Sequence, residues 1–112
     1  MVDISMPEMN KKIQKYFNKI LNGLIQIHIL HHAKQAPIYG SWMIEELKKH
    51  GYNVSPGTVY PLLHKMEAEK LLTKKIEFIE GKRRVYYETS KQGEILLREL
   101  KDKVQELFHE IL

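Results

Sequence analysis

The chain has 112 residues, the length of one small domain with a modest core. Its hydrophobic residues (43%) and charged residues (29%) are those of a folded globular protein, and the absence of cysteine excludes disulfides and thiolate chemistry. The formal charge of +4 is typical of proteins that meet phosphate-rich partners, although a solvated lysine-rich surface explains it equally well. We find neither a signal peptide nor a membrane-spanning stretch and expect a cytoplasmic protein.

Residues 1–6 lack a pattern and predict a loose tail. Helical periodicity follows from Pro7, which suits a first helical position, to about His32. Two apolar stripes lie on different sides of this helix: Ile13, Phe17, Ile20, Leu24 and Ile27 on one, and Tyr16, Leu21, Ile25 and Ile29 on the other. Since Asn22-Gly23 weakens the middle, the pattern fits one helix or two with a bend near residues 18–23.

Two shorter helices and a hairpin follow. One helix is predicted at about 39–50, ended by Gly51 as a left-handed cap, and the next at about 56–69 with Ser55 as N-cap and Pro56 at N1. Strands at about 73–79 and 83–89 flank a tip at 80–82, and Ser90 is the predicted N-cap of a last helix.

This order of elements predicts a mainly α fold with a two-stranded β-hairpin, the winged helix-turn-helix. We expect a single domain over 1–112, in which residues 7–89 form the winged helix and its N-terminal helix. Residues 90–112 are predicted to form a C-terminal dimerisation helix.

The helix at 56–69 divides into two faces at 100° per residue. The side that would face the core carries Val59, Leu62, Leu63 and Met66, and the outer side carries Gly57, Tyr60, Pro61, His64, Lys65 and Ala68, with Thr58 at the edge. Small residues permit close approach to a DNA groove, Tyr60 and Thr58 can donate to phosphate oxygens, and the cationic side chains reach phosphates or bases. The alternative is a surface helix whose first turn is distorted by Pro61.

The hairpin carries Lys82, Arg83 and Arg84 at or just after its tip. A wing so charged suits a DNA backbone or a minor groove, although three cations in a turn are also common on solvated surfaces. Residues 54–91 hold eight Lys/Arg against five Glu, so we place most of the excess charge in this half.

The last helix carries an apolar seam at coiled-coil spacing, formed by Leu97, Leu100, Val104, Leu107 and Ile111. A chain this small cannot cover this seam and both stripes of the first helix, so we predict a two-fold homodimer. Its recognition helices would meet a pseudo-palindromic site in double-stranded DNA, with half-sites roughly 34 Å apart or a multiple of that. The alternative is that the two helices pack on each other in a monomer.

Three segments resemble the PadR-like transcriptional regulators. The run SPGTVYPLLHKME at 55–67, followed by Leu71-Leu72, resembles the family's recognition helix, PIYG at 37–40 its entry to the second helix, and 81–93 its wing. The match covers about residues 19–112, and a single C-terminal helix resembles the short subclass. One departure is Lys70, where the family commonly has glycine, which leaves open whether the helix-to-strand turn is the same.

The resemblance implies a homodimeric repressor of promoter DNA, often responsive to small hydrophobic or aromatic effectors. Carried over by position, the DNA contacts would be Tyr39, Ser55, Gly57, Thr58, Tyr60, His64 and the wing cations Lys82, Arg83 and Arg84; the helix projection adds Lys65. Two rival interpretations remain: a ligand-sensing dimer and a winged helix used for protein–protein contact.

Other features carry weaker signals. His28, His31 and His32 have a spacing that can hold a metal, but no acidic residue or cysteine is near in sequence, so a structural or interfacial role is favoured. Trp42 could line an effector pocket, although a half-buried core role is favoured. We expect no cofactor, no metal and no enzymatic activity, because no catalytic constellation is present.

Overall fold

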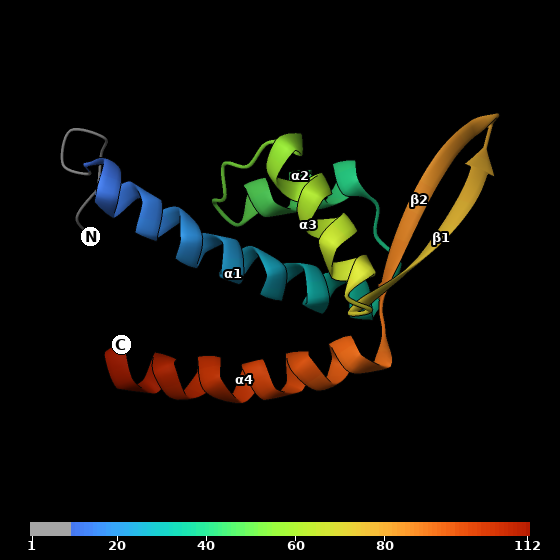
Figure 1. Cartoon of the computed structure of the whole chain (residues 1–112). Coiled ribbons are helices and arrows are strands. Elements are labelled where there is room, and N and C mark those ends of the chain that lie inside the picture. Colours follow the sequence, from blue (N-terminus) through green and yellow to red (C-terminus); the bar gives the residue numbers. More distant parts are fainter. Residues whose placement is uncertain (1–9) are drawn as a thin grey trace.

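The computed structural model describes residues 10–112, so the expected tail and the predicted helix start at Pro7 lie outside the described part (Figure 1). Its elements are α1 (Lys11–Gln35), α2 (Gly40–Lys49), α3 (Pro56–Ala68), β1 (Leu72–Ile79), β2 (Lys82–Thr89) and α4 (Lys91–Ile111). The fold is thus mainly helical with a two-stranded antiparallel hairpin, as predicted. No helix of residues 10–112 has the length and apolarity needed to cross a bilayer.

Helix α1 is a single continuous helix, which settles the question of a bend near residues 18–23. The side chain of Asn10 caps it by accepting a hydrogen bond from the backbone N–H of Ile13 at 3.0 Å. Near Gly23 the side chain of Gln26 donates to Asn22 Oδ1 at 3.0 Å, which links two successive turns. The glycine therefore weakens the helix without breaking it.

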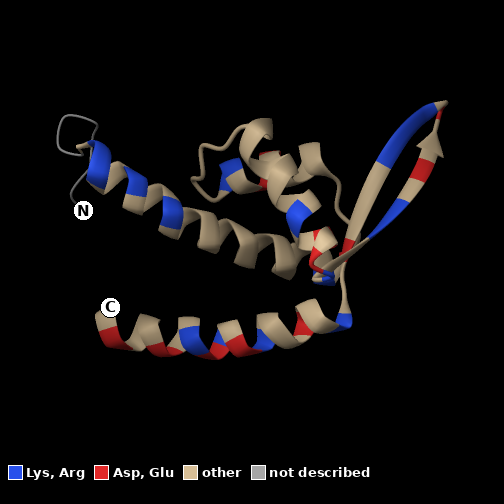
Figure 2. Cartoon of the chain, viewed as in Figure 1, with Lys and Arg blue, Asp and Glu red and all other residues tan. Residues whose placement is uncertain are grey.

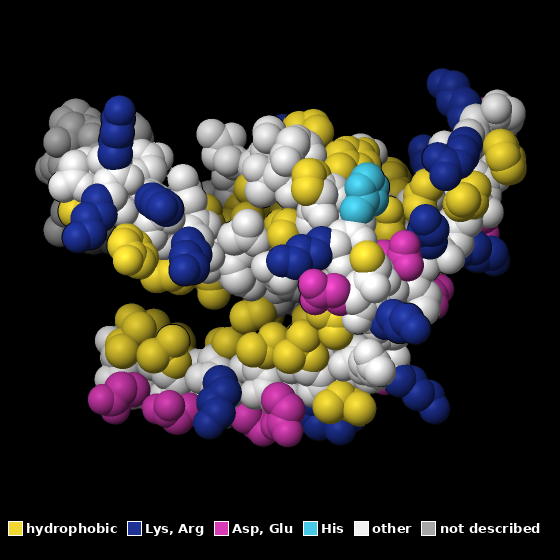
Figure 3. Space-filling model, in the orientation of Figure 1, with side chains coloured by type: hydrophobic (Ala, Val, Ile, Leu, Met, Phe, Trp, Pro, Cys, Tyr) yellow, Lys and Arg dark blue, Asp and Glu magenta, His cyan; other side chains and the backbone are white. Residues whose placement is uncertain are grey.

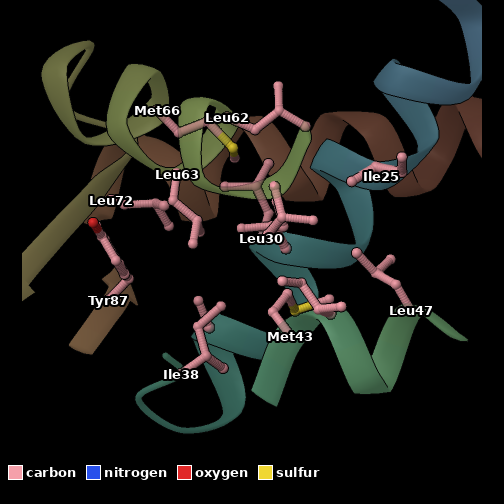
Figure 4. Packing of buried hydrophobic residues seen from close by; sticks show 14 of the residues in the cluster. Ile25, Leu30, Ile38, Met43, Leu47, Leu62, Leu63, Met66, Leu72 and Tyr87 are labelled. Carbon is pink, nitrogen blue, oxygen red and sulfur yellow. The ribbon is translucent and has the colours of Figure 1, made fainter. Parts of the chain in front are cut away.

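The core forms where the C-terminal half of α1 meets α2 and α3 (Figure 4). The four residues predicted on the inner side of α3 are all buried, and Ile29, Met43 and Leu47 complete the centre of this cluster. Leu72 and Tyr87 of the hairpin pack on its edge. We call these three packed helical segments the helical body.

The turn between α2 and α3 follows the predicted cap chemistry in part. Gly51 has φ +88°, the left-handed conformation that ends α2. Ser55 occupies the N-cap of α3 and Pro56 its first position, but the Ser55 hydroxyl makes no capping hydrogen bond among the described residues. The Ser55 carbonyl accepts from the N–H groups of Thr58 and Val59 instead.

The hairpin closes with a two-residue turn, Glu80-Gly81, in which both residues have positive φ. Lys82 pairs with Ile79 and belongs to β2, so the predicted three-residue tip is corrected to two. Ile38, just before α2, exchanges two backbone hydrogen bonds with Tyr87 at 3.0 and 2.7 Å. This bridge holds the start of α2 against the base of the wing.

In the turn from α3 to β1, Lys70 has φ +65°. The turn therefore has the left-handed conformation that glycine favours, although the residue is lysine. The Ser90 hydroxyl donates to the Lys70 carbonyl at 2.7 Å and accepts from the N–H of Gly93, which confirms Ser90 as the N-cap of α4. Helix α4 buries only Gly93 and Leu97, and residues 101–112 are all exposed.

Candidate nucleic-acid interface

The outer face of α3 is open to solvent along its length. Five predicted contact residues on this helix or its cap are exposed and Thr58 is partly buried; the exposed ones are Ser55, Gly57, Tyr60, His64 and Lys65. The opposite face anchors the helix through four buried side chains, which hold α3 in place against α1 and α2. The division between an anchored and an open face is the one that the sequence predicted.

Tyr60 lies against the first turn of α2. A Cβ atom added to Gly40 would fall 2.3 Å from the Tyr60 ring, so any other residue would force this ring to move. Tyr60 is 38% exposed. Its ring lies where α3 meets the first turn of α2, the two helices of the helix-turn-helix. The sequence identified Tyr60 as a contact but gave no sign that Gly40 positions it.

Arg84 of the wing stacks on Tyr39, the N-cap residue of α2. The guanidinium carbon lies 4.2 Å from the centroid of the Tyr39 ring, which is the geometry of a cation–π contact. A side-chain hydrogen bond with Tyr86 raises the pKa of Arg84, and nearby Tyr39 adds to this. Two predicted contacts from distant parts of the chain thus lie together, with the Arg84 side chain exposed.

The three wing cations do not form one cluster. Side chains alternate between the faces of a strand, so Lys82 and Arg84 share one face of β2 while Arg83 lies on the other. Arg83 shares its face with Tyr87, whose pKa is raised by burial and by the nearby Glu67 and Tyr60 and lowered by Arg83 itself. The wing therefore offers cations on both of its faces, toward Tyr39 on one and toward the α3 side on the other.

Basic charge also extends onto α1, which the sequence reasoning missed. This helix carries no acidic residue, and it carries five lysines, which are at positions 11, 12, 15, 19 and 34 (Figure 2). Lys19 lines a cleft of about 660 Å³ between α1 and α3 together with Thr58 and Lys65. The lysines at 11, 12, 15 and 19 are the sequence signal for this charge. The excess charge is therefore not confined mainly to residues 54–91.

An apolar groove of about 700 Å³ lies between α1 and α4. Figure 3 shows hydrophobic side chains along the facing sides of these helices, while charged ones cover the opposite side of α4. Leu24, Ile27, Leu97, Val104 and Phe108 line the groove. Trp42 lies elsewhere: it is 38% exposed and its ring meets that of His32 edge-on, with centroids 5.6 Å apart.

Comparison with known proteins gives consistent matches. The family model described as "Transcriptional regulator PadR-like family" matches residues 29–99. The transcriptional regulator Rv3488 of Mycobacterium tuberculosis is 41% identical over 88 residues, which are 79% of this chain and 82% of that protein.

Solved structures extend the similarity to the whole fold. A PadR family transcriptional regulator from Eggerthella lenta superposes with a TM-score of 0.75 at 25% identity, covering 88% of each chain. A PadR-like transcriptional regulator from Bacillus cereus gives a TM-score of 0.75 at 32% identity, covering 83% of this chain and 92% of that one.

Proposed function

Because the chain belongs to the PadR-like family of transcriptional regulators, we propose that it is a repressor that binds a specific double-stranded operator as a homodimer. It is a regulator and not an enzyme. The observation that carries the proposal is the open outer face of α3 beside the Arg84–Tyr39 stack. Together they form one surface with hydrogen-bond donors and cations.

In this proposal α3 enters the major groove. Gly57 permits close approach, and Tyr60 and Thr58 donate to phosphate oxygens. In the first turn Pro56 has no N–H and the N–H groups of Thr58 and Val59 donate to Ser55, so the Gly57 N–H is the backbone donor left for a phosphate. His64 and Lys65, further along the exposed face, reach phosphates or the acceptor edges of bases.

The wing supplies contacts that flank the groove. Arg84 is held by Tyr39 and Tyr86, so less side-chain entropy is lost when its guanidinium meets a phosphate. Lys82 shares its face, while Arg83 projects from the other face. We therefore expect Arg84 to contact the backbone and Arg83 to serve the side of the wing nearer α3.

The homodimer is proposed from apolar surface that this chain leaves uncovered. Helix α1 exposes Ile13, Phe17, Ile20 and Leu24, and α4 exposes Val104, Leu107, Phe108 and Ile111. The two helices diverge toward the N-terminal end of α1 and the C-terminal end of α4 (Figure 1), and the groove lies between them. A second copy placed by two-fold symmetry would cover this apolar surface and align two α3 helices on a pseudo-palindromic site.

A small aromatic or hydrophobic effector is a second proposal, and it is favoured by the same groove. A volume of about 700 Å³ with mainly apolar walls suits a planar ligand, and a dimer would enclose it further. Trp42 remains the candidate effector residue of the sequence, although it does not line this groove.

The experiment is a mobility-shift titration with the chain's own promoter region at several salt concentrations. We expect specific binding whose affinity falls steeply with salt, and at least a tenfold loss for Tyr60→Ala combined with Arg83→Ala and Arg84→Ala. Lys103→Ala on α4 is the matched control and should bind as the parent does. Unchanged affinity in the triple variant would contradict the proposal and favour a protein-interaction role for the wing.

A further inference from the structure

Three histidines from two helices meet on the surface of the helical body. His28 and His32 lie one turn apart on α1, and His50 follows α2 as its C-cap. Each histidine offers one ring nitrogen, and these three nitrogens all lie within 4.8 Å of one another. The ring centroids of His28 and His50 are 4.9 Å apart and those of His32 and His50 are 5.9 Å apart. The cluster therefore replaces the His28, His31, His32 group considered from spacing alone.

A carboxylate lies beside this group. Glu46 Oε2, one turn before His50 on α2, lies 3.3 Å from His50 Nε2 and 3.8 Å from His32 Nε2. Its side chain is only 17% exposed, and its other oxygen, Oε1, lies 3.7 Å from Lys49 Nζ. No acidic residue was near the α1 histidines in sequence, and the packing of α2 on α1 is what supplies one.

His32 shows an unmet bonding requirement. Its Nε2 atom is buried and has no hydrogen-bond partner among the described residues, since 3.8 Å to Glu46 is too long for one. A buried polar nitrogen without a partner costs free energy and calls for an explanation such as a bound ion. An ion pair between Glu46 and His50 leaves the buried His32 Nε2 without a partner among the described residues.

We infer that His28, His32, His50 and Glu46 form a binding site for a divalent transition metal of the zinc class. Three imidazole nitrogens and one carboxylate oxygen are a ligand set that zinc accepts in tetrahedral geometry. Bonds of about 2.0–2.1 Å place tetrahedral ligand nitrogens ~3.4 Å apart, so the rings must close by small side-chain rotations. His50 is exposed and free to make that movement.

The protonation state of the α1 histidines agrees with this role. Burial lowers the pKa of His28 and of His32, and neighbouring histidines lower both further. Both imidazoles are therefore mainly neutral near pH 7, the form that ligates a metal. Metal binding would fasten α1 to α2 because each helix supplies two ligands.

Trp42 gives the site an internal reporter. It is the single tryptophan of the chain, and its ring packs edge-on against His32 at 5.6 Å. A metal bound through His32 should change its fluorescence. This readout is independent of DNA, so the metal site and the proposed repressor function can fail separately.

The test uses the untagged full-length chain stripped with a chelator and titrated with Co²⁺, which Zn²⁺ then displaces. We expect one Co²⁺ per chain with a tetrahedral visible spectrum, a change in Trp42 fluorescence, and a higher Tm with Zn²⁺. His50→Gln and His32→Gln should each weaken Zn²⁺ affinity more than about tenfold.

His31→Gln is the matched control, since His31 lies on the same helix outside the cluster. It should retain full affinity. Because His50 is exposed and caps a helix, His50→Gln keeps the fold and decides the result even if His32→Gln unfolds. The inference is overturned if the parent chain fails to bind Co²⁺ and Zn²⁺ at micromolar protein, if His50→Gln binds as tightly as the parent, or if His31→Gln loses the metal.

Discussion

The helical body and the free ends of α1 and α4 are equally rich in apolar residues but differ in what covers them. In the body, Ile29, Met43, Leu47 and Leu63 are completely buried by one another. In the outer helices the residues at the same periodicity remain open, and none of residues 101–112 is buried. The body is therefore a finished core within one chain, whereas the outer helices carry the apolar surface that the proposed dimer would bury.

The largest effect is expected where the core is finished. Leu63→Ala removes a completely buried side chain from the centre of the body and should lower the free energy of unfolding by about 2–5 kcal/mol. Urea denaturation followed by circular dichroism measures this. Phe78→Ala is the control, because Phe78 on the wing is 73% exposed and should change stability by less than about 0.5 kcal/mol. Similar losses in both variants would show that the wing is part of the core.

The second prediction tests the unfinished side. Phe17→Glu combined with Leu107→Glu places charges on exposed stripes of α1 and α4, where they cost the single chain little. A dimer that buries these positions should be weakened at least 100-fold, since each apolar side chain contributes about 1.5–3 kcal/mol on burial. Analytical ultracentrifugation over a range of concentrations gives the dimer dissociation constant.

Its control is Glu99→Gln together with Lys103→Gln, two charged and exposed positions of α4. This variant should dimerise as the parent does. If the parent itself sediments as a monomer at all concentrations, or if the glutamate variant still dimerises, the outer helices do not form the proposed dimer interface.

The sequence predicted the body better than the arrangement of the site. Periodicity identified the buried side of α3 because a helix repeats every 3.6 residues, and Ser55-Pro56 located its start to the residue. The same reasoning named Tyr39 and Arg84 through the family resemblance. It could not bring them together, because their stack depends on the bridge between Ile38 and Tyr87, which joins segments far apart in the sequence.

The histidine cluster could not be predicted from the sequence, for the same reason. The spacing of His28 and His32 was visible, but Glu46 and His50 reach them only through the packing of α2 on α1. The cap prediction for α3 holds in position only: Ser55 is the N-cap residue, but its side chain does not make the expected hydrogen bond. Spacing along a helix is readable from the sequence, whereas spacing between helices is a property of the fold.

The third prediction concerns Gly40, which joins the body to the candidate interface. Gly40→Ala forces the Tyr60 ring to move, and because this ring is 38% exposed and can turn toward solvent, we expect a loss of at most about 1 kcal/mol together with weaker DNA binding. Gly23→Ala is the matched control, because nothing lies within 4 Å of the added Cβ on α1. Removing a mid-helix glycine there should stabilise the chain by about 0.5–1 kcal/mol. Thermal melts and mobility shifts of both variants decide whether Tyr60 depends on that close approach.

The smallest effect is expected at Lys70, where the helical body passes into the wing and α4. Lys70 holds a left-handed backbone conformation that costs a non-glycine residue about 1–2 kcal/mol, so Lys70→Gly should stabilise the chain by roughly 1 kcal/mol despite the added freedom of the unfolded state. Lys70→Ala keeps the strain while removing the same long side chain, and it should leave stability within about 0.5 kcal/mol of the parent. Chemical denaturation separates the two variants. Equal stability of the glycine and alanine variants would mean that the turn relaxes in solution. A gain restricted to glycine would show that the junction is rigid, so that the carbonyl of residue 70 is held where it accepts the hydrogen bond from Ser90 at the start of α4.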